Sequence, residues 1–324
     1  MKLVIFSEAG FEYGFGHFYR MSGICEKAIK DYGEAEMYLV ADETARDNLK
    51  REYVRFADWH DASEYERILD KESTLVVDSY HVDLAELERF QELARDMIVI
   101  DDNIRLDYHD MKILNPNYFA MWIDYPQDSN NTVYSGKDCT LLRDEFRMRE
   151  NRVVRRDISN ILVTMGGTDP KGLTQEIIRR IKSIDTIPPQ ATIHAVCTEA
   201  YKNLNEIKQA MGQGDKLHLN AGASEVRDLM LKCDFAVASA GGTTNELIKM
   251  QCPAVLVAVA DNQMVNTRLL SEKGYVLAAY GDKLDAIESI CDYDTRQSMA
   301  QKLKEFETDR SGKDIICEIA FRRS

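Results

Sequence analysis

The chain has 324 residues, of which 44 % are hydrophobic, and its 55 acidic residues against 41 basic ones give a net charge of −14. This length predicts about two domains. The acidic balance argues against a nucleic-acid or anionic-membrane binder, although a local basic pocket for phosphate stays compatible with it. No apolar run reaches the about 18–20 residues that span a bilayer. The start of the chain turns acidic at Glu8, before the core of a signal peptide could develop.

The cysteines are spread singly along the chain, without any Cys-x-x-Cys spacing. Their odd number and wide spacing are typical of reduced, mostly buried thiols in a cytoplasmic protein. The sequence therefore predicts no zinc site. The cysteines are Cys25, Cys139, Cys197, Cys233, Cys252, Cys291 and Cys317.

Short apolar runs alternate with helical patterns such as 82–94 through the first half of the chain. Such runs are typical of strands in a parallel sheet that is covered on both faces. Because the ligands of these sheets gather at the carboxyl ends of the strands, we expect a site near Ser7, 78–80, 101–102 and 115–117. The predicted strands are 2–6, 36–41, 75–78, 97–100 and 112–115.

A charged stretch without clear periodicity, 147–157, interrupts this pattern and is predicted to be a linker. A second α/β alternation follows it and ends in a helical region that begins at Thr295. We therefore predict two doubly wound, Rossmann-like domains, 1–148 and 157–324, with a cleft between them. The last helix is predicted to belong to the second domain, with the alternative that it returns to pack on the first domain. The strands predicted in the second half are 160–165, 192–196, 235–238 and 254–258.

The stretch from Gly14 to Arg20 is a glycine-bearing turn between the first predicted strand and the first predicted helix. Gly14 and Gly16 let a phosphate or a sugar approach the backbone, and the helix start directs its amides at an anion. His17 stands at that start, where the local field disfavours an imidazolium and leaves a neutral ring able to accept a proton. The alternative is that His17 is a partly buried packing residue.

Two further glycine turns lie at strand-to-helix junctions in the second half of the chain. Their amides and short hydroxyl side chains suit a diphosphate, which the positive end of a helix favours. Each turn alone is weak evidence, because tight turns need glycine in any case. The residues are Gly166, Gly167 and Thr168 in one turn, and Gly241, Gly242, Thr243 and Thr244 in the other.

Several polar residues have two interpretations each. Glu246, in the first turn of its helix, either complements the helix dipole or accepts hydrogen bonds from both hydroxyls of a ribose. Asn262 and Gln263 either form a turn or offer amides to a sugar. Asp101 and Asp102 could hold a metal or act as an acid and a base. Adjacent residues at a strand end point to opposite sides, however, which favours a loop cap.

Other nucleotide sites lack support in the sequence. Gly14-Phe15-Gly16 follows a strand and Asp42 ends the next strand, as in a dinucleotide site, but Tyr19 occupies the position of the third glycine. No glycine turn is followed by a lysine in the Walker arrangement, and no Gly-x-Ser-x-Gly elbow occurs.

The motifs of the chain resemble, in the right order, those of the nucleotide-sugar hydrolases of pseudaminic acid biosynthesis and the related spore-coat polysaccharide biosynthesis proteins. These hydrolases act on UDP-2,4-diacetamido-2,4,6-trideoxy-β-L-altropyranose. The wider group resembles the glycosyltransferase that adds N-acetylglucosamine to the peptidoglycan lipid intermediate, which implies a two-domain GT-B fold. The resemblance rests on Gly14-Phe15-Gly16-His17 with Arg20, and on 77–80, 100–102, 141–146, 165–170, 240–247 and 261–263.

The resemblance implies an inverting hydrolysis without a metal or another cofactor. His17 would take a proton from a water that attacks the anomeric carbon. UDP would leave with its charge held by the glycine turns near Gly167 and 242–244, and Glu246 would bind the ribose. The residues implied to bind the sugar are Gly14, Gly16, Arg20, Asp78, Tyr80, Arg143, Asn262 and Gln263.

Three segments depart from the family pattern and would face the sugar or the base: 7–13, 115–117 and Asn245. The main alternative is a soluble GT-B glycosyltransferase, in which His17 deprotonates an acceptor hydroxyl instead of water. A second alternative is a non-catalytic nucleotide-sugar-binding protein. In each case the expected partner is a small-molecule UDP-sugar, with no nucleic acid and no membrane insertion.

Overall fold

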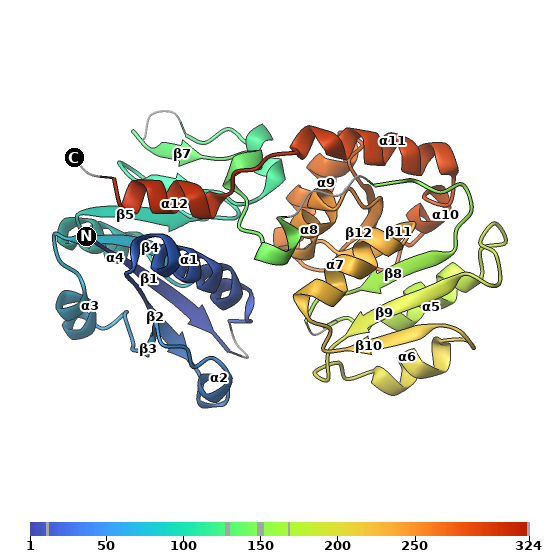
Figure 1. Cartoon of the computed structure of the whole chain (residues 1–324), viewed down its shortest axis with the longest axis horizontal. Coiled ribbons are helices and arrows are strands. Elements are labelled where there is room, and N and C mark those ends of the chain that lie inside the picture. Colours follow the sequence, from blue (N-terminus) through green and yellow to red (C-terminus); the bar gives the residue numbers. More distant parts are fainter. Residues whose placement is uncertain (11–12, 127–129, 148–151, 168, 323–324) are drawn as a thin grey trace. The chain divides into compact units, whose positions relative to one another are not determined.

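The computed structural model describes residues 1–10, 13–126, 130–147, 152–167 and 169–322. The chain folds into two compact units, each built on one parallel sheet (Figure 1). The first unit consists of Met1–Arg143 and Thr308–Ser324, and the second of Asp144–Glu307. Of the predicted linker at 147–157, residues 148–151 lie outside the described residues.

The first unit contains a seven-stranded sheet in the order β3-β2-β1-β4-β5-β6-β7, with neighbouring strands parallel. Nearly all side chains of β1 and β4 are buried, as their continuous apolar runs predict for central strands covered on both faces. The sequence did not predict β3 and β7, which have only three residues each. The strands are β1 (Lys2–Ala9), β2 (Ala35–Ala41), β3 (Val54–Phe56), β4 (Ser73–Asp78), β5 (Asp96–Ile100), β6 (Lys112–Leu114) and β7 (Thr132–Tyr134).

The two faces of this sheet pack against different helices. Alternate residues of β1 enter opposite hydrophobic clusters, Leu3 and Ile5 on the side of α1 and α12, Val4 and Phe6 on the side of α4. The helices are α1 (Gly16–Tyr32), α2 (Glu43–Asn48), α3 (Ala62–Ile68), α4 (Leu84–Leu93) and α12 (Gly312–Ala320), with 3-10 turns η1 (Tyr118–Trp122) and η3 (Lys137–Cys139).

The helix α12 completes the core of the first unit although it comes from the end of the chain. Its buried side chains share a cluster with α1, and the rings of Tyr32 and Phe321 stack with their centroids 4.3 Å apart. Figure 1 shows α12 beside α1 and β4. A Cβ atom on Gly312 would overlap the carbonyl oxygen of Cys139, so this close approach needs glycine at the start of the helix.

The second unit contains a six-stranded parallel sheet in the order β10-β9-β8-β11-β12-β13. The strands are β8 (Asn160–Thr164), β9 (Thr192–Cys197), β10 (Lys216–Leu219), β11 (Phe235–Ser239), β12 (Ala254–Ala258) and β13 (Leu277–Tyr280). The helices are α5 (Thr174–Lys182), α6 (Leu204–Ala210), α7 (Ala223–Lys232), α8 (Thr243–Lys249), α9 (Met264–Glu272), α10 (Ala286–Ser289) and α11 (Tyr293–Leu303), with 3-10 turns η4 (Asp144–Phe146), η5 (Asp261–Gln263) and η6 (Lys304–Phe306).

Two arginines of the predicted linker fasten the chain to this second unit. Arg152 donates from Nη1 to the carbonyl oxygen of Met230 at 2.7 Å, and Arg155 donates from Nε to Oδ1 of Asp234 at 2.7 Å. Both partners lie in or just after α7, so these side chains hold the chain in place as it enters β8.

Each sheet reverses its strand order once, between β1 and β4 in the first unit and between β8 and β11 in the second. The loops that follow the two strands at such a point run to opposite sides, and this leaves room for a ligand at the carboxyl edge. The predicted doubly wound α/β class is therefore confirmed. Within the described ranges, no helix combines the length and the apolar character needed to span a bilayer.

Candidate active site

The turn between β1 and α1 lies at the reversal point of the first sheet. Gly10 and Gly14 form a short antiparallel bridge, and both have positive φ angles, of 146° and 74°. A Cβ atom on Gly14 or Gly16 would meet no atom of the described residues within 4 Å. The helix α1 begins at Gly16 without a side-chain cap. The turn therefore combines open space with uncapped amides directly before His17.

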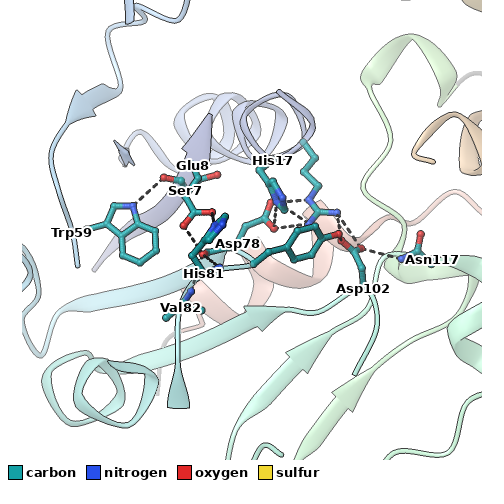
Figure 2. A network of polar contacts seen from close by, with 12 residues as sticks. Ser7, Glu8, His17, Trp59, Asp78, His81, Val82, Asp102 and Asn117 are labelled. Carbon is teal, nitrogen blue, oxygen red and sulfur yellow. Dashed lines mark hydrogen bonds and ion pairs between the residues drawn. The ribbon is translucent and has the colours of Figure 1, made fainter. Parts of the chain in front are cut away.

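His17 and Asp78 form a buried pair at this edge. The Nδ1 atom of His17 lies 2.8 Å from Oδ1 of Asp78, which ends β4 (Figure 2). His17 is 6 % exposed and Asp78 is 0 % exposed. A carboxylate only accepts hydrogen bonds, so we assign the ring proton to Nδ1. Among the described residues Nε2 of His17 has no hydrogen-bond partner, and this nitrogen is left as a proton acceptor.

Arg20, one turn further along α1, keeps Asp78 ionised. Its Nε donates to Oδ2 of Asp78 at 2.7 Å, and its Nη2 donates to Oδ1. Burial by itself would raise the pKa of Asp78, but the charge of Arg20 and the hydrogen bonds from Arg20 and His17 outweigh burial and hold that pKa well below its ordinary value. The carboxylate therefore stays charged across the physiological pH range and fixes the orientation of the His17 ring.

Asp102 accepts hydrogen bonds from a second set of donors beside the pair of His17 and Asp78. Arg20 donates from Nη1 to both of its oxygens at 3.0 and 2.9 Å, Tyr80 donates its hydroxyl at 2.7 Å, and Asn117 donates from Nδ2 at 2.9 Å. The ring of Tyr80 stands edge-on to the ring of His17, with centroids 4.7 Å apart. Burial and the charge of Asp102 raise the pKa of Tyr80, so its hydroxyl remains a donor.

Asp101, the neighbour of Asp102, has a different role. Its carboxylate accepts from the backbone amides of Asn103 at 3.0 Å and Arg105 at 3.2 Å. Burial raises the pKa of Asp101. The two adjacent aspartates thus point into different surroundings, one capping a loop and the other joining the site. In the described part of the chain, no three His, Cys, Asp or Glu side chains are grouped so that they could hold a metal ion.

A second polar network lies next to the first (Figure 2). Glu8, near the end of β1, is 1 % exposed and accepts from the Ser79 hydroxyl at 2.6 Å and from Nδ1 of His81 at 2.9 Å. The ring of His60 lies between Glu8, at 3.4 Å, and Glu86, at 2.6 Å. Burial would raise the pKa of Glu8, but these hydrogen bonds outweigh burial and lower it.

Replacing His60 with glutamine is expected to remove a pH-dependent part of the stability. The hydrogen bonds to Glu8 and Glu86 outweigh burial and raise the pKa of His60 to about 9. The imidazolium is therefore favoured in the folded state: the stabilisation is full below an unfolded pKa of about 6.5 and is lost as pH rises through about 9.

At about 1.4 kcal/mol per pKa unit, the free energy of unfolding of the wild type should fall by about 3 kcal/mol more than that of the variant between about pH 6 and pH 10. Urea unfolding at several pH values measures this difference. Equal pH dependence in both proteins would contradict the expected role of His60.

The glycine turns of the second unit lie at the reversal point of the second sheet, after β8 and β11. Gly166 has a φ of 81°, and a Cβ atom on it would lie 3.3 Å from the hydroxyl oxygen of Ser239, at the end of β11. The Tyr201 hydroxyl donates to the carbonyl oxygen of Gly166 at 2.6 Å, and the Thr198 hydroxyl to that of Gly167 at 2.6 Å. Thr168 lies outside the described residues.

The second of these turns leads into α8. Gly242 is the N-cap residue and supplies no side chain to cap the helix. The amides of Thr244 and Asn245 donate to the carbonyl oxygens of Gly241 at 3.0 Å and Gly242 at 3.2 Å, so within the described residues the amides of Gly242 and Thr243 are the ones left for a ligand. Thr243 begins the helix, the Thr244 hydroxyl is buried without a partner in the described residues, and Glu246 is buried in the first turn. The turn therefore presents uncapped amides at the reversal point, as an anion site requires.

Gln263 adjoins this turn from η5. Its Oε1 accepts from the backbone amide of Val259 at 2.9 Å, and a Cβ atom on Gly241 would lie 4.0 Å from its Nε2. Asn262 is exposed, and Arg143, the last residue before the second unit, is half-buried. The roles of these residues toward a sugar stay predictions.

Solved structures, among them a calicheamicin glycosyltransferase, match the fold over nearly the whole chain. MurG of Acinetobacter baumannii superposes with a TM-score of 0.65 over 98 % of both chains, at 12 % sequence identity. TcCGT1, solved in complex with UDP, superposes with a TM-score of 0.63 over 99 % of this chain and 98 % of its own, at 12 % identity. The chain has the GT-B fold.

Two known proteins have a higher sequence identity to this GT-B chain than those structures have. The spore coat polysaccharide biosynthesis protein SpsG of Bacillus subtilis is 22 % identical over 86 % of this chain and 83 % of its own length. A pseudaminic acid cytidylyltransferase and UDP-2,4-diacetamido-2,4,6-trideoxy-beta-L-altropyranose hydrolase of Helicobacter pylori is 23 % identical over 62 % of this chain, which spans only 36 % of that protein. The predicted resemblance is confirmed. No protein-family model matches the chain.

The sheet of the first unit brings together residues that the sequence had grouped partly by their place at strand ends and partly by resemblance. His17, Arg20, Asp78 and Tyr80 meet in one network of the first unit. The sequence did not single out Asn117 as a partner of Asp102, nor the cluster around Glu8. Glu8 is a charged residue near the end of an otherwise apolar strand. This pattern could have indicated a polar cluster around it, because a buried carboxylate needs specific partners.

Proposed function

We propose that this GT-B chain is a nucleotide-sugar hydrolase that releases UDP and a free amino or deoxy sugar from a UDP-sugar. The observation that carries the proposal is the pair formed by His17 and Asp78. A buried carboxylate holds Nδ1, and Nε2 is left to take a proton from water. The hydrolase activity in the name of the Helicobacter pylori relative supports this proposal.

In the proposed reaction, His17 takes the proton of a water that attacks the anomeric carbon from the face opposite UDP. The carbon–oxygen bond to UDP breaks as the new bond forms, so the anomeric centre inverts. Asp78 stabilises the imidazolium that develops, and Arg20 keeps Asp78 charged. The proposed role of the amides after β8 and at the start of α8 is to hold the diphosphate, with Glu246 accepting from the ribose hydroxyls.

A glycosyltransferase is the second candidate, because the structural neighbours include glycosyltransferases. There, His17 would deprotonate an acceptor hydroxyl, and the same Asp78 and Arg20 would serve. The first candidate places the protein in surface-glycan biosynthesis of the nonulosonic acid type; the name of the Bacillus subtilis relative supports a role in polysaccharide synthesis more generally.

One assay separates the candidates. UDP-2,4-diacetamido-2,4,6-trideoxy-β-L-altropyranose and UDP-N-acetylglucosamine are each incubated with the protein, with and without a sugar acceptor, and UDP and free sugar are measured. Hydrolysis predicts equal amounts of UDP and free sugar without an acceptor. UDP release that requires the acceptor would establish a transferase instead, and tight binding without turnover would leave only a binding protein.

A further inference from the structure

His81 forms a second carboxylate–imidazole pair, which the proposed reaction does not use. Its Nδ1 lies 2.9 Å from Oε2 of Glu8, a residue that is 1 % exposed, whereas 55 % of the His81 side chain is exposed. Among the described residues, no group pairs with Nε2 of His81. As with His17, one nitrogen is held by a buried carboxylate and the other is available.

The ring of His81 is held in place although half of it is exposed. The backbone amide of His81 donates to the hydroxyl of Ser79 at 2.8 Å, and this hydroxyl donates to Glu8 at 2.6 Å. The ring of Tyr13 stands edge-on to the His81 ring, with centroids 5.0 Å apart. These contacts already restrict the side chain to few conformations. Binding a ligand would therefore cost little additional conformational entropy.

The same two loops carry both imidazoles. From the last residue of β4 onward, alternate residues serve the two networks: Asp78 and Tyr80 contact His17, whereas Ser79 and His81 contact Glu8. In the turn after β1, Tyr13 touches His81 just before the chain reaches His17. Figure 2 shows the two networks next to each other at this edge of the sheet. A substrate bound at His17 would thus lie beside a second fixed imidazole.

The charges around His81 indicate which kind of group its Nε2 can bind. Glu8 is ionised and lies directly behind the ring, and Glu86 faces the neighbouring His60. With His60 protonated, the two carboxylates still leave this cluster with a net negative charge, which disfavours an anionic substituent. A hydroxyl group suits the site in either protonation state of the ring, because a hydroxyl both donates and accepts hydrogen bonds.

We propose that Nε2 of His81 binds a hydroxyl group of the sugar, with Glu8 as the residue that positions the ring, so that the chain discriminates against sugars lacking this hydroxyl. The proposal rests on the proposed function, since it places the sugar beside His17. It predicts that the wild type prefers a substrate with the hydroxyl over its deoxy analogue by about tenfold, which corresponds to one hydrogen bond.

The test compares a UDP-sugar with its single-deoxy analogues in the wild type and in His81→Ala. UDP-N-acetylglucosamine and its 3-deoxy, 4-deoxy and 6-deoxy forms serve as probes, in hydrolysis and in calorimetric binding. We expect His81→Ala to weaken binding and lower kcat/KM about tenfold for the parent and for every analogue except one. For that one analogue, the affinity and kcat/KM of the wild type and of the variant should be equal. Affinity for UDP alone should not change.

Three further variants keep the test specific. His81→Gln, which retains a polar group, should recover part of the discrimination, and Glu8→Gln, which retains an acceptor, should lose less of it than His81→Ala. His109→Ala, at a histidine with 61 % of its side chain exposed, should behave as the wild type. An equal loss for all analogues, or no loss at all, would overturn the proposal. The calorimetric binding measurements test the role of His81 even if no probe is hydrolysed. An absence of hydrolysis would count against the proposed function and not against the role of His81.

Discussion

Replacing His17 with glutamine is expected to lower kcat for UDP release by about 1,000-fold, the usual contribution of a positioned general base. Glutamine is close to histidine in size and can still bond to Asp78, but it cannot take a proton from water. The residues proposed to hold UDP belong to the second unit, so the affinity for UDP should be unchanged. Steady-state hydrolysis and calorimetric titration with UDP measure the two quantities separately.

A matched control for this variant is His109→Gln. His109 is largely exposed and is paired with Asp107 at 3.5 Å, in the chain before β6. Its replacement should leave kcat unchanged. If His17→Gln retains near wild-type turnover while its melting temperature is also unchanged, His17 is not the base and the proposed mechanism is wrong.

Replacing Asp78 with asparagine should damage both catalysis and stability. The loss of the charge removes the group that stabilises an imidazolium on His17, so we expect kcat to fall by at least about 100-fold. The guanidinium of Arg20, with 18 % of its side chain exposed, would keep Asp102 as its one anionic partner among the described residues. Leaving a mostly buried charge with an incomplete partner set should cost about 3 kcal/mol.

Urea unfolding and hydrolysis rates test the two parts of this prediction. Asp101→Asn is the control, because Asp101 accepts from backbone amides and asparagine keeps an acceptor oxygen there. It should retain most of the activity. The variants His17→Gln and Asp78→Asn should not be additive in kcat, since both remove the same proton transfer. Additive losses would show that Asp78 acts independently of His17.

Several contacts of the site lie far beyond the reach of local sequence patterns. His17 was a candidate from its place at a helix start, but its partner Asp78 is 61 residues away in the chain. The two meet because β4 pairs with β1, with Ser7 and Asp78 in register. Local periodicity predicts each strand and says nothing about which strand it pairs with.

The adjacent aspartates illustrate a limit of a different kind. The alternation of side chains along a strand correctly suggested that Asp101 and Asp102 act separately. Which of them caps the loop depends on the path of the following residues, since Asp101 is held by the amides of Asn103 and Arg105.

The sequence by itself determined the α/β alternation of this chain, the glycine turns before the helices, and His17 as a candidate base. These features depend on spacing and on the backbone freedom of glycine, which are local properties. Only the tertiary structure decided that Asp78 and Arg20 orient His17, and that Glu8 holds His81. These pairs depend on strand order, which brings loops distant in sequence to one edge of the sheet.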